Sequence, residues 1–263
     1  MNLIDRIDNY LVTKESRKRE RHYASDVSAC KRQLFYKWKD KTKSNPISPG
    51  ALWKMSSGNK LHDMIAEFLK ETGLEIVSEI SGRKKIKGLK YEFGYRIDNL
   101  FFDPEAKDLA GIEIKTSYGR GVKAIQKSGM PKKNDLKQVI VYMEMEDIST
   151  FYLFYFGRDN GYRTQFKVTM GKDGYLVDGK PVDYDFADIL ERLAAVEIAL
   201  DQDKLPDRDY MVAIKNGEIK DKFQKDKVEY KSSWQCRYCG WQNDCWKDEI
   251  KKYEKGDNAD DIK

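Results

Sequence analysis

Four cysteines place the strongest constraint on how this chain can fold. Cys30 stands alone near the N-terminus of the 263-residue chain, whereas Cys236, Cys239 and Cys245 form a C-x2-C-x5-C group near the C-terminus. Metal centres that prefer sulfur are commonly held by four thiolates. A single centre held by all four cysteines would have to bring the two ends of the chain together. The residues between them would then form one long loop closed by that centre.

The expected cellular compartment and the spacing of the cysteines limit which kind of centre the four thiols could form. No run of about eighteen apolar residues occurs, and the N-terminus lacks the apolar core of a secretory signal. We therefore expect a cytoplasmic protein with no membrane association, whose thiols stay reduced. The uneven spacing favours a [4Fe–4S] cluster only slightly over zinc, and buried unligated thiols are the third possibility. Four aromatic residues near the C-terminal group are expected to shield such a centre from water: Trp234, Tyr238, Trp241 and Trp246.

The apolar pattern between the cysteines predicts an α/β fold with a mixed sheet and flanking helices. Hydrophobic residues make up 40% and charged residues 35% of the chain, which is typical of a globular protein with a charged surface. Helical spacing covers the first thirty residues, a helix containing Cys30 that begins near residues 25–28, and residues 51–70, 132–145 and 184–200. Strands are predicted at residues 74–80, 90–102, 109–116 and 150–157, and a hairpin joins 161–170 to 174–182.

The strongest catalytic signal is Asp98 followed by Glu113 and Lys115. Side chains 113 and 115 share one face of the predicted strand because side chains alternate along a strand. Two carboxylates suit Mg²⁺ or Mn²⁺, and the lysine can orient an attacking water and offset charge at a phosphate. Charges on an otherwise apolar strand need a partner such as a metal, although a solvated strand face is the alternative. We prefer Asp98 to the rival carboxylates Asp103 and Glu105, which lie in a predicted turn.

Three polar residues on predicted helices could complete such a site. His62 lies on an apolar helical face, where it is either a core histidine or a further metal ligand. Gln138 and Tyr142 are one turn apart on the same helical face, so their polar ends could reach a phosphate or the lysine. Ordinary boundary positions are the alternative for this pair. His22 lies among arginines and is expected at the surface.

Basic clusters supply sequence-independent affinity for phosphate. The net charge is only +5, but lysine and arginine concentrate locally. Taken alone, a run of charge is usually a solvated face, which is the alternative for each cluster. The clusters are residues 14–22, residues 83–87, and the lysines Lys132, Lys133 and Lys137.

Six motifs follow one another along the chain: Cys30, Gly58-x3-His62, Asp98, Glu113-x-Lys115, Gln138-x3-Tyr142 and Cys236-x2-Cys239-x5-Cys245. In this order they resemble the RecB-like branch of the PD-(D/E)XK nuclease superfamily. The resemblance is closest to its iron–sulfur members, which include the CRISPR-associated adaptation exonucleases and the AddB-type nuclease subunits. The family's proline before the aspartate is absent, since Arg96-Ile97 precedes Asp98.

The resemblance implies a restriction-endonuclease-like mixed β-sheet core flanked by helices, with a [4Fe–4S] cluster joining the N- and C-terminal segments. The corresponding segments are an N-terminal helical segment with the first cluster cysteine (1–50), a nuclease core (51–204), a C-terminal cluster-binding cap (205–250) and a disordered tail (251–263). The implied residues are Cys30, Cys236, Cys239 and Cys245 for the cluster; His62, Asp98, Glu113 and the Ile114 carbonyl for Mg²⁺ or Mn²⁺; Lys115 as catalytic lysine; and Gln138 and Tyr142 as its helpers at the DNA.

The function implied by the resemblance is metal-dependent hydrolysis of DNA phosphodiester bonds. We expect an exonuclease that acts on single-stranded DNA or DNA ends, with proteins of recombination, replication or CRISPR adaptation as possible partners. No G-x4-GK[ST] loop occurs, so no helicase portion is expected. Two alternatives stay open: a DNA end-binding or complex-assembly subunit with little turnover, and a zinc-stapled protein in which the D…E-x-K pattern is incidental.

Overall fold

The chain forms two compact units, described here one at a time. The computed structural model describes residues 2–13, 19–225, 227–254 and 261–262. The sheet unit comprises Met1–Leu11, Glu20–Ser28 and Gly50–Ala194. The cysteine unit comprises Val12–Arg19, Ala29–Pro49 and Ala195–Lys263. Segments from both ends of the chain therefore belong to the same unit, and the segment 1–50 is divided between the two.

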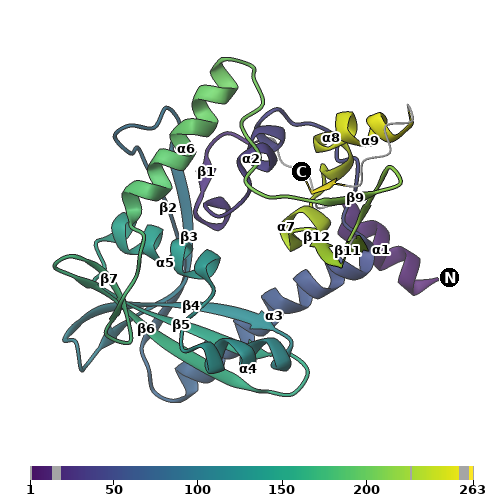
Figure 1. The fold of residues 1–263 in the computed structure, drawn as a ribbon. Helices are drawn as coiled ribbons and strands as arrows, with labels where there is room; N and C mark the ends of the chain where they lie inside the picture. Colours follow the sequence, from purple (N-terminus) through teal and green to yellow (C-terminus); the bar gives the residue numbers. More distant parts are fainter. Residues whose placement is uncertain (1, 14–18, 226, 255–260, 263) are drawn as a thin grey trace. The chain divides into compact units, whose positions relative to one another are not determined.

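A mixed sheet is the framework of the sheet unit (Figure 1). Its strand order is β1-β3-β4-β5-β6-β7-β8, with β2 also paired to β3. The β1–β3 and β4–β5 pairs are parallel and the other pairs are antiparallel. The strands are β1 (His22–Tyr23), β2 (Ile76–Lys84), β3 (Phe93–Asp103), β4 (Asp108–Ser117), β5 (Thr150–Gly157), β6 (Arg163–Gly171), β7 (Gly174–Val177) and β8 (Lys180–Pro181). This confirms the predicted mixed α/β architecture.

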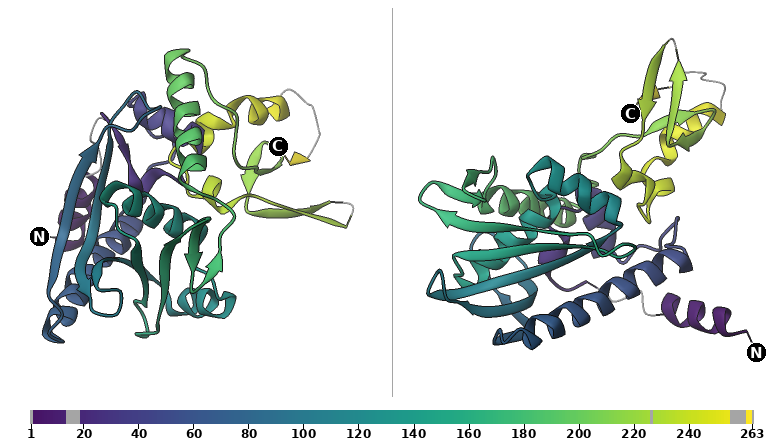
Figure 2. Two further views of the ribbon diagram at one scale, coloured as in Figure 1. Left: turned by 90° about the vertical axis from the view of Figure 1, so that its left-hand side faces the viewer. Right: turned by 90° about the horizontal axis from the view of Figure 1, so that it is seen from below.

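Helices cover both faces of this sheet. The helices that belong wholly or partly to the unit are α1 (Leu3–Thr13), η1 (Ala24–Asp26), α3 (Pro49–Glu71), α4 (Gly119–Ser128), α5 (Lys133–Glu146) and the first part of α6 (Phe186–Asp201). On one face Ile65 of α3 packs with Ile112 and Ile114. On the other, Tyr142 of α5 stacks on Phe151, with ring centroids 5.9 Å apart. The right-hand view of Figure 2 shows α3 and α5 on opposite sides of the strands.

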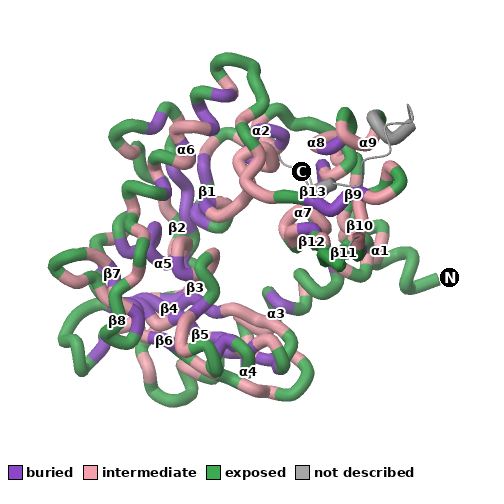
Figure 3. The backbone as a smooth tube through the Cα atoms, in the orientation of Figure 1, coloured by how far each residue is buried: buried purple, intermediate pink, exposed green. Residues whose placement is uncertain are grey.

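The core of the sheet unit lies along β4, β5 and α5, where the backbone is coloured as buried in Figure 3. Strand β5 coincides with the predicted strand 150–157, and α3, α5 and α6 match the helices predicted at 51–70, 132–145 and 184–200 within a few residues. These predictions succeeded because each segment buries a stripe or face whose period is visible locally. Helix α4 was not predicted.

The N-terminal region differs from its prediction. Helix α1 ends at Thr13, residues 14–18 lie outside the described residues, and His22 and Tyr23 form β1. The prediction that His22 lies at the surface is wrong: it is 1% exposed. Its backbone N–H donates to the Glu92 carbonyl at 2.9 Å, and its ring lies against Phe93. Parallel pairing with β3 buries it, and the basic neighbours in the sequence gave no sign of that pairing.

The cysteine unit contains more regular structure than the sequence indicated. Helix α2 (Lys31–Trp38) begins just after Cys30, which caps it with extended backbone at φ −56° and ψ 137°. The region after Pro206, for which the sequence predicted no helix or strand, contains short antiparallel strands: β9 (Ala213–Lys215), β10 (Glu218–Lys220), β11 (Lys222–Lys225), β12 (Val228–Lys231) and β13 (Asp261–Ile262). It then forms three helices: α7 (Trp234–Arg237), α8 (Gln242–Cys245) and α9 (Lys247–Glu254).

Two further sequence predictions concern the ends and the membrane. Of the predicted tail, residues 255–260 and 263 lie outside the described residues. Among the helices that the structure describes, none combines the length and the apolar character needed to cross a bilayer.

We predict that Gly111→Ala destabilises the protein. A Cβ at this position on β4 would overlap the ring of Phe151, which is fully buried, so the core would have to rearrange. Overpacking of this kind typically costs about 1–3 kcal/mol of unfolding free energy, which denaturant titration would measure. Gly50→Ala is the matched control, because a Cβ at Gly50 has no atom within 4 Å. Equal effects of the two substitutions would contradict the packing argument.

Candidate active site and cysteine cluster

The candidate site lies where strands β3 and β4 separate. The last paired residues at this end of the two strands are Asn99 and Ile112. Beyond them the Ile114 N–H donates to Oδ2 of Asp98 at 2.8 Å, so a carboxylate takes the place of a backbone acceptor. By the same register Asp98 stands opposite Glu113. The fork between the strands thus brings the two predicted carboxylates together, with the Ile114 backbone beside them.

Glu113 begins a chain of polar contacts that runs to α5. Its side chain is 3% exposed, and Oε1 lies 2.6 Å from Nζ of Lys115. The lysine also donates to Oε1 of Gln138 at 2.8 Å, and Nε2 of Gln138 donates to the Tyr142 hydroxyl. The second oxygen, Oε2 of Glu113, is buried and has no hydrogen-bond partner among the described residues. We call His62, Asp98, Glu113, Lys115 and Gln138 the charged cluster.

Burial and charge set the ionisation of this cluster. The pKa of Glu113 is raised to about 7: burial raises it most, Lys115 opposes part of that shift, and Asp98 adds to it. Burial alone would lower the pKa of Lys115, but Glu113 and Asp135 outweigh it, so that pKa is raised. Burial, and then the charge of Glu113, raises the pKa of Tyr142. At neutral pH the lysine is therefore charged, and the glutamate keeps its proton to a much higher pH than an exposed carboxyl does.

A glycine allows α3 to bring His62 to the fork. A Cβ on Gly58 would lie 2.9 Å from Oγ1 of Thr116 on β4, which is tighter than ordinary contact. One turn later in the helix, Nδ1 of His62 lies 3.3 Å from Oδ2 of Asp98. The Gly58-x3-His62 spacing therefore has a geometric reason. Gly58 lets α3 lie close to β4, and one turn later His62 is near enough to contact Asp98.

The rival carboxylate Asp103 lies at the opposite end of β3 from this fork. Its oxygens accept hydrogen bonds from the Tyr152 hydroxyl at 2.7 Å and from the Glu105 N–H at 2.9 Å. These contacts, led by the tyrosine, lower the pKa of Asp103. Its acceptor capacity is used within the fold, which makes it a structural carboxylate.

Asp135 contributes to the site and was missed in the sequence. It lies in the first turn of α5, accepts a hydrogen bond from the Tyr155 hydroxyl at 2.8 Å, and raises the pKa of Lys115. The available signal was its position three residues before Gln138, which puts both side chains on one face of the helix.

All four cysteines belong to the cysteine unit. They are partly buried, and none forms a disulfide. The pKa of Cys236 is raised to about 12, chiefly by burial and in part by repulsion from Cys30, Cys239 and Cys245. Each of the other three lies near enough to Cys236 to influence its charge. Among the described residues, no three Cys, His, Asp or Glu side chains are arranged to hold a metal ion as they stand.

Two of the four predicted aromatic residues enclose the cysteines. Trp241 and Trp246 are buried, the first packing near Cys239 and the second near Cys236. Trp234 and Tyr238 are 55% and 76% exposed, so the prediction that they shield a centre is wrong. Their side chains lie on the outer side of a short helical turn, which the composition of the segment could not show.

Polar contacts tie the segment that carries Cys30 to the C-terminal part of the chain. The Trp241 indole N–H donates to the Lys41 carbonyl at 2.8 Å. Nε of Arg32 donates to the Pro206 carbonyl at 2.7 Å, and Nη1 of Arg32 lies 3.7 Å from the sulfur of Cys245. The segment that carries Cys30 and the C-terminal segment therefore contact each other within the cysteine unit.

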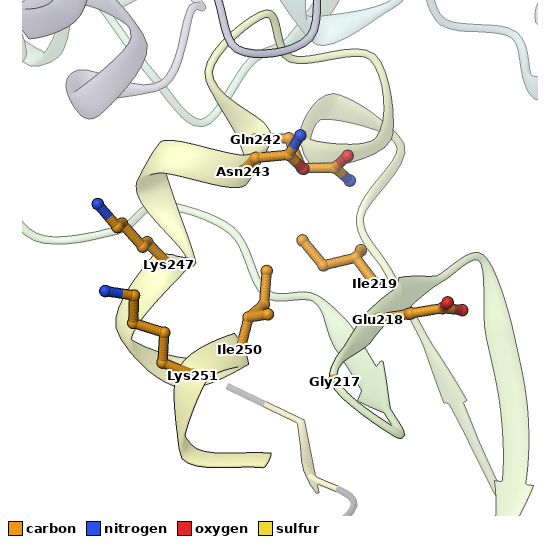
Figure 4. A pocket seen from close by; sticks show the side chains of 8 residues that line it. All are labelled: Gly217, Glu218, Ile219, Gln242, Asn243, Lys247, Ile250 and Lys251. Atoms are coloured by element: carbon orange, nitrogen blue, oxygen red, sulfur yellow. The ribbon is translucent and has the colours of Figure 1, made fainter. Parts of the chain in front are cut away.

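A pocket of about 440 Å³ also lies in the cysteine unit (Figure 4). Its apolar wall consists of Ile219 and Ile250, which also pack with Trp246. None of the residues predicted for catalysis or for cluster binding lines it. The lining residues are Gly217, Glu218, Ile219, Gln242, Asn243, Lys247, Ile250 and Lys251.

Comparisons with known proteins establish the fold and no family. No protein-family model matches the chain, and no curated protein matches it in sequence. The crystal structure of SSO0001 matches 91% of this chain and 94% of its own at a TM-score of 0.55 and 15% identity. The alkaline exonuclease LHK-Exo from Laribacter hongkongensis matches 74% and 93% of the two chains at 0.47 and 16%, and its dAMP complex 76% and 93% at 0.47 and 18%. The likeness to SSO0001 shows a shared fold.

We predict that ionisation of Glu113 destabilises the metal-free protein. The pKa rises from 4.5 unfolded to about 7 folded, so the folded state holds this proton more tightly. Relative to Glu113→Gln, wild-type stability should fall as pH rises through this window and then level off, by at most about 3 kcal/mol. Urea titrations with chelator at several pH values would measure it. Glu105→Gln, at an exposed site, should leave the pH dependence unchanged. Parallel curves for wild type and Glu113→Gln would refute the assignment.

Proposed function

We propose that the sheet unit is a metal-dependent nuclease that hydrolyses phosphodiester bonds of DNA, acting on single strands or on DNA ends. The observation that carries this proposal is Oε2 of Glu113, a buried carboxylate oxygen without a hydrogen-bond partner among the described residues. An unsatisfied buried acceptor is costly, and a cation would remove the cost. Lys115 and Asp98 beside it supply the other groups that phosphodiester hydrolysis needs.

The donor set fits a divalent metal ion. Mg²⁺ or Mn²⁺ would be held by Asp98, Glu113 and His62 together with the Ile114 carbonyl oxygen, which are the ligands that the family resemblance implies. When bound, such an ion polarises a phosphoryl oxygen and lowers the pKa of water. In the described part of the chain no three His, Cys, Asp or Glu side chains are arranged to hold an ion as they stand. Binding would therefore require side-chain rotation at the fork.

Lys115 performs the second task of the proposed site. Contacts to Glu113 and Gln138 fix its ammonium group, and its raised pKa keeps it charged. A fixed cation beside the reacting phosphate orients the attacking water and offsets negative charge in the transition state. Gln138 and Tyr142 act as positioning residues because they hold the lysine from α5.

We predict that Lys115→Met reduces DNA cleavage by about 10²- to 10³-fold with Mg²⁺ or Mn²⁺, since it removes a fixed charge from the transition state. The measurement is single-turnover cleavage of end-labelled single- and double-stranded DNA, with circular DNA to separate exonuclease from endonuclease action. Lys167→Met is the matched control, because Lys167 pairs with the structural carboxylate Asp103. Equal cleavage by both variants would overturn the site. DNA binding by the wild type without any cleavage would support the alternative of a DNA end-binding subunit.

We also predict that Mn²⁺ raises the melting temperature of the wild type but not of Glu113→Gln when both are measured above pH 7. A ligand that binds only the folded state stabilises it by mass action. Glutamine keeps the shape of the side chain but removes its charge. Calorimetry would show the shift without any catalysis. An equal shift in both proteins would place the ion elsewhere.

For the cysteine unit we propose a structural [4Fe–4S] cluster on Cys30, Cys236, Cys239 and Cys245. Supporting it are the mutual influence of the thiols and the two buried tryptophans beside them. Thiols with raised pKa values need a metal to become thiolates, and the free energy of that binding adds to folding. Because the ligands are far apart in sequence, the cluster would close a very long loop. Zinc on the same four sulfurs is the rival assignment.

We predict that Cys236→Ser abolishes the visible absorption of a thiolate–iron chromophore and lowers the melting temperature. Trp234→Ala, which changes an exposed residue of the same short helix, should preserve both. Iron, zinc and sulfide analysis of anaerobically purified protein would accompany the spectra. Zinc without iron would support the zinc site in place of the cluster. A Cys236→Ser variant with unchanged metal content and stability would rule out both assignments.

The pathway and the partners are proposed from the resemblance alone, and the location from the sequence pattern of the N-terminus and the apolar runs. Proteins of recombination, replication or CRISPR adaptation are proposed partners of the nuclease, and the cytoplasm is its proposed location.

A further inference from the structure

An exposed tyrosine and an arginine form a paired surface just beyond the C-terminal end of β4. Tyr118 lies between β4 and α4 and is 53% exposed. The guanidinium carbon of Arg158, in the turn after β5, lies 5.3 Å from the centroid of its ring. Nη1 of Arg158 donates to the Lys54 carbonyl of α3 at 2.8 Å. We call Tyr118 and Arg158 the stacking pair.

The backbone around the stacking pair is held by close contacts. The Arg158 N–H donates to the Ser117 carbonyl at 2.8 Å, which ties the turn after β5 to the end of β4. The Gly119 N–H donates to Oδ1 of Asp159 at 2.6 Å. A Cβ on Gly119 would overlap the side chain of Asn160, so only glycine permits this approach. Hydrogen bonds therefore tie the two connections that carry the pair to each other and to the end of β4.

The stacking pair has unused capacity to bind a ligand. A guanidinium carries five N–H donors, and within the described residues Arg158 uses one side-chain donor, to Lys54. The ring of Tyr118 has the guanidinium near one face and remains half exposed. An aromatic surface beside a cation is the combination that binds single-stranded nucleic acid, since bases stack on rings and phosphates pair with arginine.

The stacking pair lies just beyond β4, toward the face of the sheet that α3 covers. Tyr118 is three residues after Lys115, about 10 Å along extended backbone, and this odd spacing puts its side chain on the opposite face from Lys115, the face of Ile112 and Ile114. On α3, Lys54, whose carbonyl binds Arg158, is eight residues before His62, about 12 Å along the helix axis. The helix runs antiparallel to the strand, because Ile65 packs near Ile112 whereas the earlier residue Lys54 contacts the turn beside the end of β4.

We infer that the stacking pair binds an unpaired nucleotide of a DNA strand whose phosphate lies at the charged cluster. A base stacks on Tyr118, and Arg158 contacts a phosphate within one or two nucleotides of the cleaved bond. In a duplex both faces of a base are covered by its neighbours, so the pair favours single-stranded DNA. This inference rests on the proposed nuclease function and adds the form of DNA and the residues that select it.

The test is DNA binding in the presence of a chelator, where no cleavage can occur. Tyr118→Ala should weaken binding of a short single-stranded oligonucleotide about 5- to 100-fold, the range expected for one stacked base, and Tyr118→Trp should restore it. Binding of a blunt duplex of the same length should change little. Phe102→Ala is the matched control, since Phe102 is 57% exposed and lies at the opposite end of the β3–β4 pair.

Salt dependence tests the arginine separately. Arg158→Gln should reduce the slope of log affinity against log salt for single-stranded DNA by about one phosphate contact. Arg163→Gln removes the same charge from an exposed position on β6 and should leave the slope unchanged. Unchanged single-strand affinity in Tyr118→Ala, or an equal loss for duplex and single strand, would overturn the inference.

The binding results test the stacking pair independently of the proposed nuclease activity. Absence of cleavage by the wild type with Mg²⁺ or Mn²⁺ would remove the proposed function, and the binding data in chelator would still decide the stacking pair. With cleavage present, Tyr118→Ala should raise KM for single-stranded DNA with little change in kcat, because the ring binds the substrate away from the reacting atoms.

Discussion

The hydrogen bond from the Ile114 N–H to the Asp98 carboxylate is the contact on which the candidate site depends. It marks the point where β3 leaves β4, and it gives the freed backbone donor an acceptor at the fork. The same carboxylate oxygen lies near Nδ1 of His62. The Asp98 side chain therefore accepts the hydrogen bond of a strand N–H and also lies beside the residues that would bind a metal. Without this contact the strands would either remain paired or leave an unsatisfied donor.

A second constraint is the burial of opposite charges on β4. Glu113 and Lys115 satisfy each other only in part, because one carboxylate oxygen has no protein donor among the described residues. Burial works against ionisation of the glutamate, while the ion pair and Gln138 hold the lysine in its charged form. A fold normally pairs such groups completely. Glu113 departs from this rule inside an otherwise apolar sheet. Such departures are expected at sites that serve function rather than stability.

The cysteine unit brings together two segments that are far apart in the sequence, Ala29–Pro49 and Ala195–Lys263. Main-chain and side-chain contacts such as Trp241 to Lys41 already join these segments, and the four thiols gather in the same unit. A soft metal centre there and a hard one at the fork would use different ligands and do different work. The first would contribute to folding and the second to chemistry, so loss of one need not mimic loss of the other.

The sequence by itself determined features that depend on short-range periodicity. The alternation of β4 puts Glu113 and Lys115 on one face, and the helical repeat puts Gln138 and Tyr142 one turn apart. The cysteine layout predicted contact between the segment that carries Cys30 and the C-terminal segment, on the condition that one centre binds all four thiols. Only the tertiary structure decided which distant segments pair: it buried His22 against β3 and set Arg158 over Tyr118. Such contacts depend on strand register and helix direction, which no local pattern encodes.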